Sequence, residues 1–346
     1  MQIARINGKD YRLPESQSSF QESLYIHLIN WKWAHITTEP GHSGPIAYDA
    51  ILPDDYARQG KMPHLYPPIL DDLAAHQARN PFRMHKHFYH MASSQAATIN
   101  LFLPILHHPA AAEVLRTMKP DFASLAVDVL DRGYCLEFWG GNFEPDAAKR
   151  GPLGDKSGSH GTDADIAIAY RNPANELCLW LIEHKLAERE FTACSGPKSK
   201  NRDKSRHDCS LSYAEILQNK AACFHHDREK RNYWDITERN HGLFVNHAEH
   251  TQCPFQGGMN QLWRNQLLAL ALGEAQGGPY VDTAFSVVKH PANPHLDESL
   301  EAYRRLVAGS AKFTEINSDD VVRAAETLHD VALDQWARWY RNLYKL

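Results

Sequence analysis

Two neighbouring stretches decide the predicted fold: Gly161-Thr-Asp163-Ala-Asp165-Ile-Ala-Ile-Ala-Tyr170 and Leu177-Cys-Leu-Trp-Leu-Ile-Glu183-His-Lys185. Each is an apolar run typical of a strand, with charged residues at one end. Turn-forming residues at 171–176 separate the two runs. The pair therefore predicts an antiparallel hairpin with apolar strands and a charged end.

Four charged residues share that end of the hairpin. With a turn centred near 173–174, Asp165 lies across from about Glu183, and Asp163 lies across from about Lys185. Alternate residues of a strand point to the same face, so these side chains can converge. Ionised groups at the end of a buried hairpin cost free energy unless they are paired or bind a metal. The pattern therefore predicts a functional site.

Two carboxylates and a lysine suit the metal-assisted hydrolysis of a phosphodiester. Mg²⁺ prefers oxygen ligands and usually takes one or two protein carboxylates while it keeps several waters. The ion lowers the pKa of a bound water and stabilises charge on phosphate oxygens. A neighbouring lysine can position that water, help to deprotonate it, or neutralise developing charge. A Glu-x-Lys triplet is common by chance, so its weight comes from the two strands around it.

The same residues resemble a known family. Asp165, followed by Glu183-x-Lys185 on the next strand, is similar to the core motif of the PD-(D/E)XK, or restriction-endonuclease-like, nuclease superfamily. Ala164 stands where the superfamily usually has proline. The segments 92–102 and 285–293 are similar to those of uncharacterised bacterial members. The resemblance covers roughly residues 90 to 295 and is strongest at the hairpin.

A second likeness lies in the run Asn260-Gln261-Leu-Trp-Arg264-Asn265-Gln266-Leu-Leu. It opens an apolar helix and is similar to the downstream glutamine helix of several such nucleases. Asn265 occupies the position at which exonuclease-type members carry a tyrosine. Gln261 and Arg264 are three residues apart and face the same way on a helix, where they can orient a water or hold a phosphate. An ordinary helix surface is the alternative interpretation.

The resemblance implies both a fold and an activity. The fold is α/β, a restriction-endonuclease-like mixed central sheet flanked by helices, with a helical N-terminal elaboration. The activity is hydrolysis of DNA phosphodiester bonds with Mg²⁺ or Mn²⁺ as the cofactor. Asp165 and Glu183 are implied as metal ligands, Lys185 as the residue that positions the attacking water, and Gln261 as a catalytic assistant. A non-catalytic nucleic-acid-binding or partner-binding module on the same fold is the alternative.

The order of predicted elements favours one domain over residues 1–346. We expect a helical N-terminal elaboration at 1–130, a nuclease core at 131–295 and C-terminal helices at 296–346. Within these parts, the predicted elements are a hairpin at 3–13, a helix at 19–33, strands at 135–139 and 281–288, a helix at 259–273 and a glycine-rich, mobile loop at 140–161. Three helical segments close the chain, and the last carries an aromatic stripe from Trp336 to Tyr344, typical of packing.

Three further acidic residues are candidates for the metal site. Asp163 shares a face with Asp165 and can assist it. Glu22 can complete the metal shell from the first helix, although a capping box in Ser19-Phe-Gln-Glu22 also explains it. Glu137 on the first predicted core strand is either a site residue or a solvated edge residue.

A basic loop follows the second hairpin strand. The phosphates of a DNA backbone are the obvious partner for its flexible lysine and arginine side chains. An ordinary solvated loop is the alternative interpretation. The basic residues of the loop are Lys198, Lys200, Arg202, Lys204 and Arg206.

Four cysteines lie after the hairpin, with His207, His225 and His226 nearby. Some members of the superfamily hold zinc or an iron–sulfur cluster, but these cysteines have no Cys-x-x-Cys pair and no recognisable ligand spacing. A bound metal is therefore the less favoured alternative. The four are Cys194, Cys209, Cys223 and Cys253.

The pair His85-x-His87 supports a rival enzyme class, the zinc hydrolases, but further ligands at a convincing spacing are missing.

The net charge of −5 argues against a broadly basic surface, so positive charge for DNA would have to be confined to one groove. The N-terminus lacks a signal-like apolar core, and no run reaches membrane-spanning length, which predicts a cytoplasmic protein without a membrane partner. Cleavage of both DNA strands would favour a homodimer.

Overall fold

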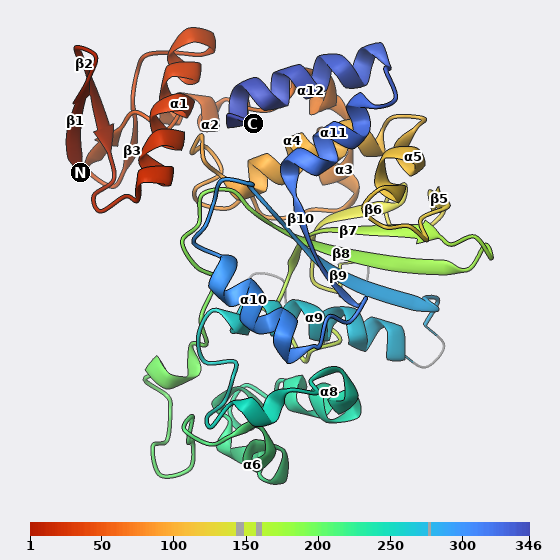
Figure 1. Ribbon diagram of the computed structural model, residues 1–346. Helices are drawn as coiled ribbons and strands as arrows, with labels where there is room; N and C mark the ends of the chain where they lie inside the picture. The colour runs from red at the N-terminus through yellow and green to blue at the C-terminus, as the bar shows by residue number, and fades with distance from the viewer. Residues whose placement is uncertain (143–148, 157–160, 276–277) are drawn as a thin grey trace.

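The computed structural model describes residues 1–142, 149–156, 161–275 and 278–346. A mixed six-stranded sheet forms the centre of the molecule, and helices cover both of its faces (Figure 1). The predicted α/β fold is therefore confirmed. Part of the predicted mobile loop at 140–161 lies outside the described residues.

The central sheet has the order β10-β9-β8-β7-β5, and β6 also pairs with β7. β8 and β9 run parallel, as do β9 and β10, whereas β5, β6 and β8 each run antiparallel to β7. The strands are β5 (Ser124–Leu125), β6 (Tyr134–Phe138), β7 (Ala164–Arg171), β8 (Leu177–Lys185), β9 (Asp282–Lys289) and β10 (Phe313–Asn317).

The hairpin of β7 and β8 has the register that its turn predicts. Ile166 pairs with Ile182, and Arg171 pairs with Leu177 next to the turn. Continued by one residue, this register places Asp165 opposite Glu183. Both strands are buried almost throughout, because helices cover both faces of the sheet.

Two apolar cores lie on opposite faces of the sheet. On one face, Ile168 of β7 and Trp180 of β8 pack with the helices drawn above the sheet in Figure 1. On the other face, Ala167 and Leu181 pack with α9 and α10. The alternation of these residues along each strand is the two-residue period of a pleated sheet.

The helices fall into three groups. The N-terminal part contains α1 (Ser19–His35), α2 (Asp54–Arg58), α3 (Leu70–Arg79), α4 (Ser94–Leu106) and α5 (Ala111–Arg116). The segment between β8 and β9 contains α6 (Tyr213–Gln218), α7 (Phe224–Asp227), α8 (Tyr233–Arg239) and α9 (Met259–Glu274). The chain ends with α10 (Asp297–Leu306), α11 (Ser318–Glu326) and α12 (Val331–Tyr344).

The N-terminal part also carries two small hairpins. They are formed by β1 (Gln2–Ile6) with β2 (Lys9–Leu13), and by β3 (Gly41–Ser43) with β4 (Ile46–Tyr48). The first confirms the hairpin predicted at 3–13. The capping box of α1 lies one residue earlier than predicted, because Ser18 caps the helix and Gln21 completes the box.

The C-terminal part corrects one prediction. Three helices are present, but the strand β10 lies between α10 and α11 and extends the sheet beside β9. Its five residues are too short to show a clear strand period, and its pairing partner lies 28 residues away, so the sequence did not reveal it. The aromatic stripe of α12 packs in the core as predicted, with Trp336 and Tyr340 buried.

In the described part of the chain, no helix combines the length and the apolar character that a membrane span requires. The proposed boundaries at 130 and 295 stay a prediction.

Candidate active site

The charged end of the β7–β8 hairpin opens into a cavity of about 670 Å³. Asp163, Asp165, Glu183 and Lys185 all line it, so the predicted convergence of the four side chains is present in the structure. Further lining residues come from α1, from the segment that leads into α4 and from the first turn of α4. They include Gln21, Tyr25, His85, His87, His90 and Gln95.

Glu183 is held by three side chains. Lys185 Nζ donates to its Oε1 at 2.7 Å, and Gln261 Nε2 donates to the same oxygen at 2.7 Å. Asn265 Nδ2 donates to Oε2 at 2.8 Å. Gln261 and Asn265 lie four residues apart on α9 and therefore share one face of that helix. Both oxygens of this nearly buried carboxylate thus have fixed positions.

Asn265 is a site residue that the sequence alone does not reveal. The resemblance of the helix to other nucleases marks Asn265 only as the residue that replaces a tyrosine. In the structure its side chain is fully buried and donates a hydrogen bond to Glu183. Its spacing of four from Gln261 is the signal that could have identified it. Gln261 itself is anchored by the Thr192 N–H group, which donates to its Oε1 at 3.1 Å.

Asp165 faces Glu183 across the hairpin. Its Oδ2 accepts a hydrogen bond of 2.7 Å from the backbone N–H of His184. Burial raises the pKa of Asp165 well above its usual range, and the nearby carboxylates of Glu183 and Glu137 raise it further. Asp165 is therefore an acid whose charge the protein groups around it leave poorly compensated.

Glu137 and Asp163 complete an acidic cluster with Asp165 and Glu183. Burial, followed by the charge of Asp163, raises the pKa of Glu137 to about 8. Burial, followed by the charge of Glu183, raises the pKa of Asp163 to about 6. Glu137 has a φ of +50° inside β6, a left-handed conformation that non-glycine residues adopt at a cost. The structure therefore favours the site role for Glu137 over the solvated-edge alternative.

Lys185 contributes a positive charge to this cluster, with its Nζ 2.7 Å from Glu183 Oε1. Burial alone would lower the pKa of its ammonium group, but Glu183, Glu188 and Asp165 raise it above the usual value. Lys185 therefore stays protonated at neutral pH and acts as a donor and a positive charge. The ammonium group of Lys185 and the guanidinium of Arg264 face four carboxyl groups, and this imbalance suits a divalent cation.

The donor chemistry fits Mg²⁺ better than a metal caged by protein. Within the described ranges, no three His, Cys, Asp or Glu side chains form a group that could hold an ion by themselves. Mg²⁺ needs only one or two carboxylates, since waters and substrate oxygens fill its other positions. Asp165 and Glu183 supply that number.

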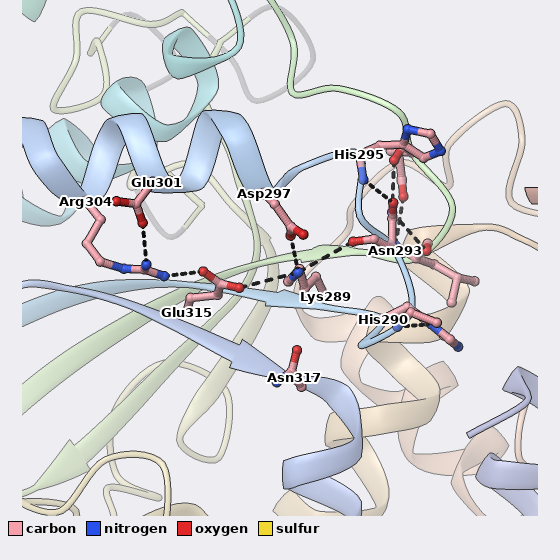
Figure 2. Close-up of polar contacts among 12 residues, drawn as sticks. Lys289, His290, Asn293, His295, Asp297, Glu301, Arg304, Glu315 and Asn317 are labelled. Carbon is pink, nitrogen blue, oxygen red and sulfur yellow. Dashed lines mark hydrogen bonds and ion pairs between the residues drawn. The ribbon is translucent and has the colours of Figure 1, made fainter. Parts of the chain in front are cut away.

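The loop after β9 supports the end of β8 that carries Lys185. The His290 N–H donates to the Lys185 carbonyl at 3.1 Å, and Asn293 Nδ2 donates to the Glu188 carbonyl at 3.0 Å. Figure 2 shows Lys289 at the start of this loop, where it forms ion pairs with Asp297 and Glu315. The loop therefore orders the chain on both sides of the site lysine.

The sequence of the chain matches the model of a known family. The sequence model described as "restriction endonuclease associating with ARP" matches residues 30–345. The chain belongs to this family. The predicted restriction-endonuclease-like relationship is thereby confirmed. No curated protein and no solved structure shows a significant match to the chain.

In this member of the restriction-endonuclease family, the structure places two further candidate residues, Glu22 and Arg264, differently with respect to the cavity. Glu22 is not among the residues that line the cavity, whereas Gln21 and Tyr25 of the same helix α1 line it. Arg264 Nη1 lies 3.3 Å from Oγ1 of Thr162, which precedes β7, and the charge of Arg264 lowers the pKa of Asp163. Arg264 thus flanks the acidic cluster.

Some basic residues of the loop after β8 are exposed, and others bond to the protein itself. Lys198, Lys200 and Lys204 are exposed. Arg202 donates to the carbonyls of His207 and Pro197, so it holds the loop together. Arg206 is exposed and forms an ion pair with Asp227.

Four cysteines gather in the helical segment between β8 and β9. Their charges affect one another's pKa values, so Cys194, Cys209, Cys223 and Cys253 lie in one region. No three of them, with or without the neighbouring histidines, are arranged to hold a metal ion in the described structure. His85 and His87 line the acidic cavity without forming a zinc group with other described residues there. We therefore propose neither a zinc nor an iron–sulfur centre.

Proposed function

We propose that the protein is a Mg²⁺- or Mn²⁺-dependent deoxyribonuclease that hydrolyses phosphodiester bonds. The observation that carries this proposal is the convergence of Asp165, Glu183 and Lys185 in one cavity at the end of a central hairpin. Membership of a restriction-endonuclease family supports DNA as the substrate. The fold alone would leave the activity open, so the site residues must be tested directly.

The proposed roles follow from the surroundings of each residue. Asp165 and Glu183 would hold the ion, which when bound supplies an activated water and positive charge for the phosphate oxygens. Gln261 and Asn265 fix the orientation of Glu183. Lys185 carries its positive charge within hydrogen-bonding distance of Glu183, where it can position a water and neutralise charge on a phosphate.

Metal binding at this site is expected to depend on pH. The raised pKa values of Asp163 and Glu137, about 6 and about 8, mean that these carboxyls lose protons across the neutral range. For Glu137, the folded state binds more protons than the unfolded chain up to about pH 8. Its contribution to the free energy of unfolding therefore falls as the pH rises toward that value. Mg²⁺ favours the ionised forms and opposes this loss.

The Mg²⁺-induced rise in Tm should therefore be larger at about pH 8.5 than at about pH 6. Thermal melts in Mg²⁺ and in EDTA at each pH measure this rise. Groups remote from the site affect both melts equally, so their contribution to Tm cancels when the two values are subtracted. Stabilisation is on the order of 2.7 kcal/mol when the ion is at about a hundred times its dissociation constant. A rise that is absent, or equal at both pH values, would contradict a metal site among these carboxyls.

The exposed lysines of the basic loop are proposed as DNA contacts. Replacing Lys198, Lys200 and Lys204 by alanine should weaken DNA binding for all sequences alike. It should also reduce the slope of log K against log salt concentration by about 0.9 for each phosphate that the variant no longer neutralises. A triple alanine variant at the exposed bases Arg132, Arg323 and Arg338 is the charge-matched control. An unchanged salt slope in the loop variant would remove the loop from the interface.

The nuclease activity is tested with circular, linear and single-stranded DNA in Mg²⁺, Mn²⁺ or EDTA. We expect cleavage that requires the metal, and the circular substrate separates internal cleavage from cleavage at an end. Binding without cleavage in any metal would instead support the non-catalytic binding module. A homodimer stays a prediction, tested by the oligomeric state in solution.

A further inference from the structure

Cys194 belongs to a chain of three hydrogen-bonded side chains outside the acidic cavity. Its Sγ lies 3.4 Å from Nε2 of His225. The other ring nitrogen of His225, Nδ1, lies 2.6 Å from Oε2 of Glu229. A thiol, an imidazole and a carboxylate in this order form the arrangement that activates a cysteine nucleophile.

The surroundings of Cys194 favour a thiolate. Burial would raise the pKa of its thiol, but the hydrogen bond from His225 and the N–H of Gly196 lower it below the usual value. Burial would likewise lower the pKa of His225, whereas Cys194 and Glu229 raise it to about 9. A Cβ atom at Gly196 would lie 3.4 Å from Sγ, so this glycine leaves only narrow room beside the sulfur.

Some charged groups around Cys194 and His225 favour the thiolate of Cys194, and others oppose it. Arg264 lowers the pKa of Cys194, and it also lowers the pKa of Glu229. Arg231 lies 3.6 Å from Glu229 and helps to hold that carboxylate. Three further thiols lie in the same region, and any of them that ionised would oppose a thiolate at Cys194. They are Cys209, Cys223 and Cys253.

The other five cysteines provide the contrast. Burial raises the pKa of every one of them. Cys135 and Cys178 are buried strand residues, whereas Cys209 is partly exposed, as Cys194 is. Cys209 is therefore a matched internal control for thiol reactivity.

We propose that Cys194, paired with His225 and Glu229, is a reactive modification site that takes hydroperoxides and small alkylating electrophiles. With hydrogen peroxide, the thiolate sulfur forms a bond to one peroxide oxygen while the O–O bond breaks. The sulfur retains a hydroxyl group as sulfenic acid and is oxidised by two electrons. The leaving hydroxide takes the proton of His225 Nε2 and departs as water, so the peroxide is the species reduced.

The first test uses the native full-length protein. Brief treatment with iodoacetamide at about pH 6.5, followed by peptide-resolved mass spectrometry, gives an alkylation rate for each cysteine. We expect Cys194 to react at least about ten times faster than Cys209, since only the thiolate is the nucleophile. Equal rates, or no reaction at Cys194, would overturn the proposal without any variant having to fold.

The second test isolates the imidazole. His225→Gln should slow alkylation of Cys194 at about pH 6.5 by about tenfold, because the thiolate loses its cationic partner. His226→Gln changes the adjacent histidine, which faces Asp235 instead, and should leave the rate unchanged. Trapping with dimedone after peroxide treatment should label Cys194 in the wild type. A rate unaffected by His225→Gln, or an absent sulfenic acid, would contradict the assigned chemistry.

Discussion

Replacing Lys185 by methionine is expected to reduce DNA cleavage by at least about 10²-fold while DNA binding persists. Methionine preserves much of the volume of the buried side chain but removes the ammonium group that donates to Glu183. Loss of one preorganised donor at a site of developing charge costs on the order of 10²- to 10³-fold in rate. Single-turnover cleavage and fluorescence anisotropy on the same DNA separate the chemical step from binding.

Lys220→Met is the matched control for this variant. Lys220 is also a partly buried lysine in an ion pair, with Asp235 and Glu238, but it is not among the residues that line the cavity. This control should cleave DNA at the wild-type rate. If Lys185→Met kept its activity, or lost DNA binding together with cleavage, the role assigned to Lys185 would be wrong.

Asp165→Asn should reduce Mg²⁺-dependent cleavage by about 10³-fold and at the same time stabilise the protein in EDTA. The asparagine can still accept the hydrogen bond from the His184 N–H, so the hairpin end is preserved. It removes a buried acidic group that Glu183 and Glu137 repel. Loss of a metal ligand worth about 4 kcal/mol in the transition state corresponds to about 10³-fold in rate.

The two effects of Asp165→Asn have opposite signs, which makes the variant informative. Thermal melts should show a higher Tm than the wild type in EDTA and a smaller rise on addition of Mg²⁺. Asp128→Asn, at an exposed carboxylate paired with Arg171, is the control and should change neither quantity noticeably. A variant that is merely destabilised, with a normal response to Mg²⁺, would contradict the proposed metal role.

The hairpin at the centre of the site could be predicted from local residues. The turn formers at 171–176 set the register, and the two-residue period of the strands then placed Asp165 opposite Glu183. Gln261 is implied by the resemblance of its helix to the glutamine helix of the nuclease superfamily. Only the hairpin is therefore predicted from the geometry of a short segment.

Other parts of the site depend on contacts between distant segments. Asn265 bonds to Glu183 across 82 residues, and the left-handed backbone at Glu137 arises where β6 meets β7. Strand β10 exists because β9 offers it an edge. Which side of α1 meets the cavity is likewise set by distant packing: Gln21 and Tyr25 line the cavity, whereas Glu22 is not among its lining residues.

The central claim is that the acidic end of the β7–β8 hairpin performs metal-dependent phosphodiester hydrolysis. Its most direct test compares single-turnover cleavage by the wild type and Glu183→Gln, side by side, in Mg²⁺ and in EDTA. We predict cleavage only by the wild type and only in Mg²⁺, with equal DNA binding by both proteins. Cleavage by folded Glu183→Gln at the wild-type rate, or by the wild type in EDTA, would contradict the claim.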